Sequence, residues 1–264
     1  MELFGYLSAV LIGLILGLIG GGGSILTVPV LVYLFHIEPS LGTAYSLFVV
    51  GSSSLIGVFP KWKRSEVEVK TALIFGLPSM LSVFLTRKWL LPLVPDPIID
   101  MEHFVLGKSS AMMLFFSMLM LFAAIRMLLP KKEEEINDVA DRNSWFSLAI
   151  QGLLVGLLTG FVGVGGGFLI VPALVMYSKL PMKIAVGTSL FIISINSLVG
   201  FTGDVWSQGG KMDWSFLFLI TSLSIIGIVI GGNLAKSMKT LFLRKSFAWF
   251  VLIMACVVFL REIL

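Results

Sequence analysis

Two glycine-rich clusters are the residues whose type and spacing best suit a defined chemistry. Gly20-Gly21-Gly22-Gly23 comes just before a short apolar stretch at 25–36, and Gly163-Val164-Gly165-Gly166-Gly167 comes just before another at 168–178. Glycine lets backbone N–H groups approach a ligand closely, and the N–H groups and positive dipole at the start of a helix bind anions. The clusters therefore predict an anion site made of backbone donors, without any charged side chain.

Hydroxyl and amide side chains extend this predicted site. Ser24 and Thr27 follow the first cluster, and further polar residues lie in the apolar stretches at 41–59 and 184–203. Asn196 is the most costly of them to bury, whereas a hydroxyl in a membrane helix often bonds its own backbone and is then structural. The predicted substrate-binding residues are Gly20, Gly21, Gly22, Gly23, Ser24, Thr27, Ser46, Gly163, Gly165, Gly166, Gly167, Thr188, Ser189 and Asn196.

Close helix packing is the alternative role for the glycines. It explains Gly13 and Gly17, and likewise Gly156 and Gly160, better than ligand binding does, because both pairs have helical spacing. Pro29 and Pro172, near the start of the stretches that follow the clusters, are expected to be structural.

Catalytic and metal-binding patterns are missing from the sequence. It has one cysteine, no Cys/His metal spacing, no GxxxxGK[ST] phosphate loop and no nucleophile–base pair. Ionisable residues such as Arg87 and Asp204 fall in loops or at the ends of the apolar stretches, which gives no sign of an intramembrane proton relay. We expect no enzyme activity, no catalytic residue, no cofactor and no metal.

The elements that position these residues are membrane segments. The 264 residues are 57% hydrophobic and 13% charged, against about 45–50% and 25% in a soluble domain, and the mean hydropathy is +1.02. These values exclude a soluble enzyme, a disordered chain and a disulfide scaffold. The apolar stretches cover residues 3–19, 25–36, 41–59, 70–86, 104–129, 145–162, 168–178, 184–203, 214–235 and 245–263.

Two of these ten stretches, 25–36 and 168–178, have only 12 and 11 residues. As helices they reach about 16–18 Å, less than a bilayer needs, so we expect broken or re-entrant half-helices; whether they span fully stays open. With ten segments, 14 basic residues fall on one side and 5 on the other. Because basic residues mark the cytoplasmic side, both termini are expected outside in a multi-pass protein of the cell membrane.

The chain contains an internal repeat. A shift of 143 residues aligns 13–57 with 156–200 without a gap and with 17 identities in 45 positions. Five segments in each half mean that the halves insert with opposite orientation, as in inverted-repeat secondary transporters. We predict an all-α protein with a first repeat at 1–129, a charged cytoplasmic linker at 130–144 and a second repeat at 145–264.

The doubled motif resembles a known family. Gly-x-x-Gly-x-Gly-Gly followed within six residues by proline, at Gly17–Pro29 and again at Gly160–Pro172, is similar to the TauE/SafE sulfite-exporter family of membrane permeases. The Gly187-Thr188-Ser189-Leu190-Phe191 stretch and the Gly231-Gly232 pair also resemble it, whereas Ala44-Tyr45-Ser46 and the proline-rich stretch at 92–97 depart from it. The resemblance implies movement of sulfur-containing anions such as sulfite, thiosulfate or organosulfonates, commonly by export.

The sequence thus predicts a secondary transporter that exports a small sulfur-containing anion by alternating access. A passive anion channel and an importer of the same anions stay open as alternatives. The expected partners are the small anion and membrane lipid; no nucleic acid is expected because the basic residues form no face, and a homo-oligomer stays open. The anion, the direction, the coupling ion and the oligomeric state do not follow from the sequence.

Overall fold

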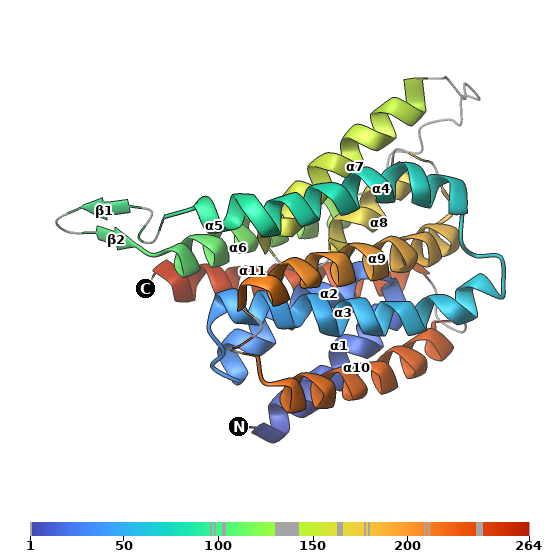
Figure 1. Ribbon diagram of the computed structural model, residues 1–264. Coiled ribbons are helices and arrows are strands. Elements are labelled where there is room, and N and C mark those ends of the chain that lie inside the picture. The colour runs from blue at the N-terminus through green and yellow to red at the C-terminus, as the bar shows by residue number, and fades with distance from the viewer. Residues whose placement is uncertain are drawn as a thin grey trace.

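The structure, a computed structural model, is a bundle of helices with one short β-hairpin (Figure 1). It describes residues 2–95, 97, 99–101, 104–129, 143–162, 166–176, 178, 180–208, 210, 212–235 and 240–263. The elements of the first half are α1 (Glu2–Ile19), the 3₁₀ turn η1 (Gly21–Gly23), α2 (Ser24–Pro29), the π-helical turn η2 (Val30–Leu34), α3 (Pro39–Trp62), α4 (Val69–Leu85), the π-helical turn η3 (Thr86–Leu90), α5 (Leu91–Leu93), β1 (Ile99–Met101), β2 (Phe104–Leu106) and α6 (Lys108–Leu128). Those of the second half are α7 (Asn143–Val162), α8 (Gly167–Met176), α9 (Met182–Gln208), α10 (Trp214–Leu234) and α11 (Thr240–Ile263).

Each of the ten predicted apolar stretches corresponds to a helical segment, with one difference in the fifth. Residues 104–106, which we expected to open that helix, form strand β2 and pair antiparallel with β1, Ile99 facing Leu106. Pro95 and Pro97 follow α5 and do not allow the helix to continue, and α6 begins only at Lys108. Most of the predicted linker at 130–144 lies outside the described residues.

The helices suit a bilayer in length and in surface. Four are long and apolar enough to cross a membrane, Pro39–Trp62, Val69–Leu93, Met182–Trp206 and Trp214–Leu234, among the residues described. On α4, Leu73, Leu77 and Leu81 recur every four residues with 46%, 55% and 56% of their surface exposed. An apolar stripe of this kind is unfavourable in water and favourable against lipid.

The packing of the first half recurs in the second. Helix α1 packs on α10 and α7 packs on α4, while α10 also contacts α3 and α4 also contacts α9. The 143-residue shift matches α1 with α7 and α3 with α9. The central pair, α3 and α9, is antiparallel: Gly57 lies against Leu190, and Gly200 lies against Leu47, the matching pair of positions.

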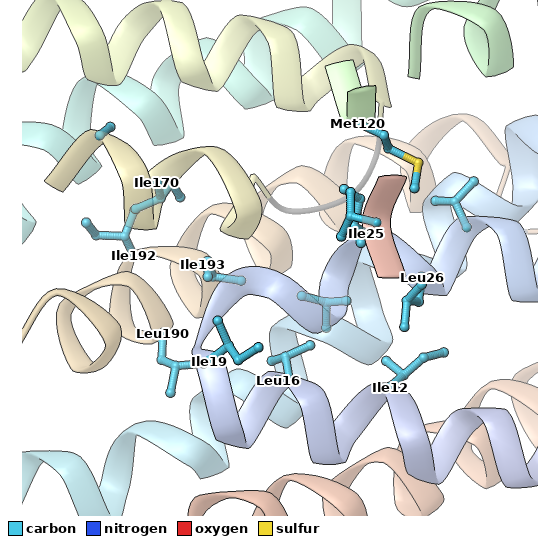
Figure 2. Close-up of a cluster of buried hydrophobic side chains, with 14 of the residues drawn as sticks. Ile12, Leu16, Ile19, Ile25, Leu26, Met120, Ile170, Leu190, Ile192 and Ile193 are labelled. Carbon is cyan, nitrogen blue, oxygen red and sulfur yellow. The ribbon is translucent and has the colours of Figure 1, made fainter. Parts of the chain in front are cut away.

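Apolar side chains of both halves form two buried clusters between the helices. Figure 2 shows Ile25 of α2 and Ile170 of α8 in the same cluster as residues of α1 and α9. The predicted packing role of four glycines is confirmed, because Gly13 and Gly17 lie against the backbone of α10, Gly156 lies against Ser79 of α4, and Gly160 lies against Thr86 of η3, which continues α4.

Candidate anion site

The first helix break lies between α1 and α2, at the predicted cluster. Helix α1 ends at Ile19, and Gly20 takes φ +81°, which residues with a side chain rarely adopt. Residues 21–23 form the 3₁₀ turn η1 that leads into α2 at Ser24, and all four glycines are buried. The backbone therefore changes direction inside the protein.

The second break lies between α7, which ends at Val162, and α8, which begins at Gly167. Gly166 takes φ +75°, and its carbonyl accepts hydrogen bonds from the N–H groups of Leu169 and Ile170, both at 2.9 Å. Two predicted residues of this cluster, Gly163 and Gly165, lie outside the described residues. The N–H groups that precede Leu169 at the start of α8 have no acceptor within the helix itself.

The two breaks lie together. A Cβ atom on Gly21 would overlap the backbone of Gly167, and a Cβ atom on Gly167 would overlap the backbone of Gly21. Only two glycines allow this approach, because any side chain would push the two segments apart. The contact brings the start of α2 and the start of α8, from different halves of the chain, to one buried place.

Two predicted hydroxyl groups are buried without a hydrogen-bond partner. Thr27 in α2 and Ser46 in α3 are 0% exposed, and neither Oγ1 of Thr27 nor Oγ of Ser46 has a partner among the described residues. A buried polar group in this state costs about 1–3 kcal/mol. Ser54 and Ser197, which match each other under the 143-residue shift, show the same feature on α3 and α9. These two were absent from the predicted site.

The remaining predicted side chains bond within the protein. Ser24 Oγ donates to the Gly21 carbonyl at 2.6 Å, Thr188 Oγ1 accepts from the Glu68 N–H at 2.9 Å, and Ser189 Oγ donates to the Val186 carbonyl at 2.8 Å while lying beside Gly20. Asn196 Nδ2 donates to Ser79 Oγ at 2.6 Å, but its Oδ1 has no partner within the described chain. Asn196 is thus half satisfied.

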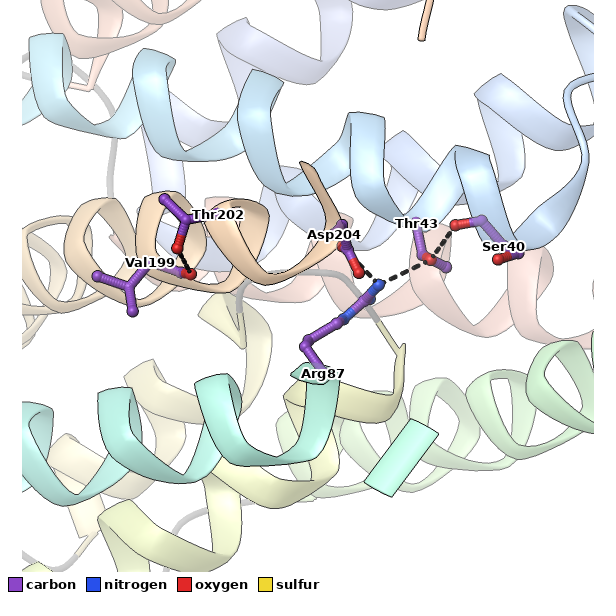
Figure 3. A network of polar contacts seen from close by, with 6 residues as sticks. All are labelled: Ser40, Thr43, Arg87, Val199, Thr202 and Asp204. Carbon is purple, nitrogen blue, oxygen red and sulfur yellow. Dashed lines mark hydrogen bonds and ion pairs between the residues drawn. The ribbon is translucent and has the colours of Figure 1, made fainter. Parts of the chain in front are cut away.

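The buried ion pair between Arg87 and Asp204 was not predicted from the sequence. The side chains of Arg87 and Asp204 are 0% and 2% exposed, and Arg87 Nη1 lies 2.8 Å from Asp204 Oδ2. Figure 3 shows Arg87 reaching from the end of α4 toward α9 and toward Thr43 of α3. We had placed Arg87 in a loop and Asp204 at a segment end, but both helices continue past these residues. The apolar residues Trp89, Leu90 and Leu91, directly after the charged pair at 87–88, were the signal that α4 runs on.

Comparison with known proteins gives the family. The family model described as sulfite exporter TauE/SafE matches residues 6–258. The chain belongs to the TauE/SafE family. This TauE/SafE chain is 29% identical over 262 residues to a protein of Xylella fastidiosa named "Probable membrane transporter protein", covering 96% of this chain and 92% of that one. It is 27% identical to YunE of Bacillus subtilis, with 88% and 89% covered, and 27% identical to MJ0441 of Methanocaldococcus jannaschii, with 72% and 69% covered; both carry the same name.

No solved structure gives a significant match. The family and the names of the relatives indicate that this TauE/SafE protein is a membrane transporter, and its apolar helices support a multi-pass membrane protein. The resemblance stated from the doubled glycine motif is therefore confirmed.

Proposed function

We propose that this TauE/SafE protein is a secondary transporter that carries a small sulfur-containing oxyanion across the cell membrane by alternating access. The observation that carries the proposal is the backbone contact between Gly21 and Gly167. The buried hydroxyls of Thr27 on α2 and Ser46 on α3, which have no partner among the described residues, support it. Two helix starts that converge inside the protein offer N–H groups and positive dipole ends to an anion. Sulfite as the substrate follows from the family's description alone, and thiosulfate and organosulfonates extend the proposal to related sulfur-containing anions.

Two repeats of opposite orientation are one common basis of alternating access, and several contacts support this arrangement here. Besides the matching pairs of α3 and α9, Ser53 and Asn196 are related by the 143-residue shift and make matching hydrogen bonds. Ser53 donates to Ser224 of α10, and Asn196 donates to Ser79 of α4. Matching contacts made by antiparallel helices are those expected about a two-fold axis in the membrane plane.

The membrane orientation is part of the proposal. Both chain ends lie at the same end of the bundle as the β-hairpin (Figure 1), which agrees with an even number of segments. The 14-to-5 distribution of basic residues puts this end outside the cell. Export is the proposed direction, on the family's description.

The decisive experiment widens the glycine contact. Gly21→Ala and Gly167→Ala are expected to lower sulfite counterflow in proteoliposomes by about tenfold or more, because each methyl group separates the two helix starts and weakens the backbone hydrogen bonds to the anion. Gly232→Ala is the matched control, since a Cβ atom there meets nothing within 4 Å. Sulfite flux that persists in both glycine variants contradicts the backbone site. Flux that does not saturate and shows no counterflow favours a passive channel.

The hydroxyl groups give a second readout that a packing role does not produce. Thr27→Val and Ser46→Ala remove unpartnered buried hydroxyls, so the melting temperature in detergent should hold or rise. Sulfite affinity should nevertheless fall by about 3- to 10-fold, the size of one lost hydrogen bond. A lower melting temperature with unchanged affinity would show that the hydroxyls stabilise the fold and do not contact the anion.

A further inference from the structure

Arg87 is a buried cation whose hydrogen-bonding capacity is only partly used. It belongs to the candidate membrane span Val69–Leu93, and its side chain is 0% exposed. Nη1 donates to Asp204 Oδ2 at 2.8 Å and to Thr43 Oγ1 at 3.1 Å. Nε and Nη2 have no partner among the described residues. An ionisable residue at this depth is usually functional.

The unused atoms form one edge of the guanidinium plane. Nε and Nη2 point their N–H groups in nearly parallel directions, which is the fork that binds two oxygen atoms of a carboxylate, sulfonate or similar oxyanion. A buried pair that served stability alone would be expected to use this fork on its own carboxylate, because unpaired buried donors are costly. Here Asp204 and Thr43 both bind Nη1, which fixes the guanidinium plane, and Nε and Nη2 have no partner in the part of the chain that the structure describes.

The chain around Arg87 contacts the helix that leads into the second break. Arg87 follows Thr86, whose side chain lies against Gly160 on the last turn of α7. Thr159, the neighbour of Gly160, lies against Gly166 of the break. Arg87 also sits in the π-helical turn η3, a distortion that is frequent at functional sites. The residue before Arg87 and Gly166 of the break thus both contact the last turn of α7.

We propose that the Nε–Nη2 edge of Arg87 is a binding site for an oxyanion, with Asp204 and Thr43 as positioning residues. The inference rests on the proposed transport function for the view that this oxyanion is the cargo. Asp204 neutralises Arg87 while the site is empty, so the anion meets a site that holds it without trapping it. Release matters as much as capture in a transport pathway.

Binding to the purified protein tests the site separately from transport. Sulfite, methanesulfonate and chloride are titrated against the detergent-solubilised chain by calorimetry and thermal shift. Arg87→Lys keeps the charge but removes the two parallel N–H donors, and should weaken sulfite and methanesulfonate binding by about 10- to 100-fold. The effect on chloride should be smaller, because a single atom has no pair of oxygen acceptors to match the two donors. Lys88→Gln, at the exposed neighbouring position, is the matched control and should leave the affinities for sulfite and methanesulfonate unchanged.

Asp204→Asn should change sulfite affinity in the opposite direction. The amide can still accept from Nη1, but the negative charge near the fork is gone, so sulfite should bind about tenfold more tightly. A purely structural pair predicts no gain in affinity. This measurement also decides the matter if Arg87→Lys does not fold.

The outcomes separate the two proposals. Unchanged oxyanion affinity in Arg87→Lys and Asp204→Asn overturns the Arg87 site, even where the glycine variants lose flux and transport stands. Arg87-dependent binding without any sulfite flux in the wild type supports the site and overturns the transport proposal. A wild type that binds no oxyanion overturns both.

Discussion

The two ends of α3 carry different ion pairs. Near its start, Thr43 joins Arg87 and Asp204, whose side chains are 0% and 2% exposed. Near its end, Lys61 pairs with Glu66 at 2.9 Å, and these side chains are 11% and 21% exposed. When the 143-residue shift is extended four residues beyond the aligned stretch, it aligns Lys61 with Asp204. Matching positions of the repeat thus carry opposite charges.

The partner helices differ in the same way. An offset of 145 residues that matches Ser79 of α4 with Ser224 of α10 also matches Arg87 with Gly232. Arg87 is buried at one end of the bundle. At the other end, Gly232 and Lys61 border a groove of about 510 Å³. In the part of the chain that the structure describes, a buried charge pair thus lies at one end of the bundle and a groove lies at the other. Under the proposed alternating access, such a difference would correspond to one of the two access states.

The largest expected effect comes from breaking the buried pair. Arg87→Ala leaves Asp204 buried without its cation and should lower the free energy of unfolding by about 3–5 kcal/mol. Lys61→Ala, at the more exposed pair, should cost only about 1 kcal/mol. Melting temperatures of both variants in detergent measure the difference.

Arg87→Ala combined with Asp204→Ala is the control for this comparison. The double variant should recover part of the loss, because it removes both buried charges. Equal costs for Arg87→Ala and Lys61→Ala would show that the two ends of α3 do not differ in the way that burial indicates.

How far the sequence predicts the molecule depends on the range of the interaction. Hydropathy, prolines and glycines act locally, so the segments and both helix breaks were predictable. The approach of Gly21 to Gly167 was expected from the repeat, because both clusters occupy matching places. The Arg87–Asp204 pair was missed because a charge at the edge of an apolar stretch reads as a loop residue. Only the fold reveals that the helix continues and that a counter-ion 117 positions away meets it.

A smaller effect distinguishes the two matching hydrogen bonds. Ser79→Ala would leave both polar atoms of the Asn196 amide without a partner, since Oδ1 already has none within the described chain, and should cost about 2 kcal/mol. Ser224→Ala frees only the Ser53 hydroxyl, which can rotate to its own helix backbone, and should cost about 0.6 kcal/mol. Unfolding in a detergent titration measures both. A larger loss of stability in Ser224→Ala would contradict the expectation that the Asn196–Ser79 hydrogen bond contributes more to stability than the Ser53–Ser224 bond.

The smallest effect concerns Gly232, the position that the 145-residue offset aligns with Arg87. A Cβ atom on Gly232 meets nothing within 4 Å, whereas one on the adjacent Gly231 would overlap the backbone of Leu14. Gly232→Ala should therefore stabilise α10 by about 0.5–1 kcal/mol through helix propensity, and Gly231→Ala should destabilise the protein by about 1–3 kcal/mol through overpacking. A loss of stability in Gly232→Ala would mean that this end of the bundle closes in solution as tightly as the Arg87 end does. The difference between the ends would then belong to one conformation and not to the sequence.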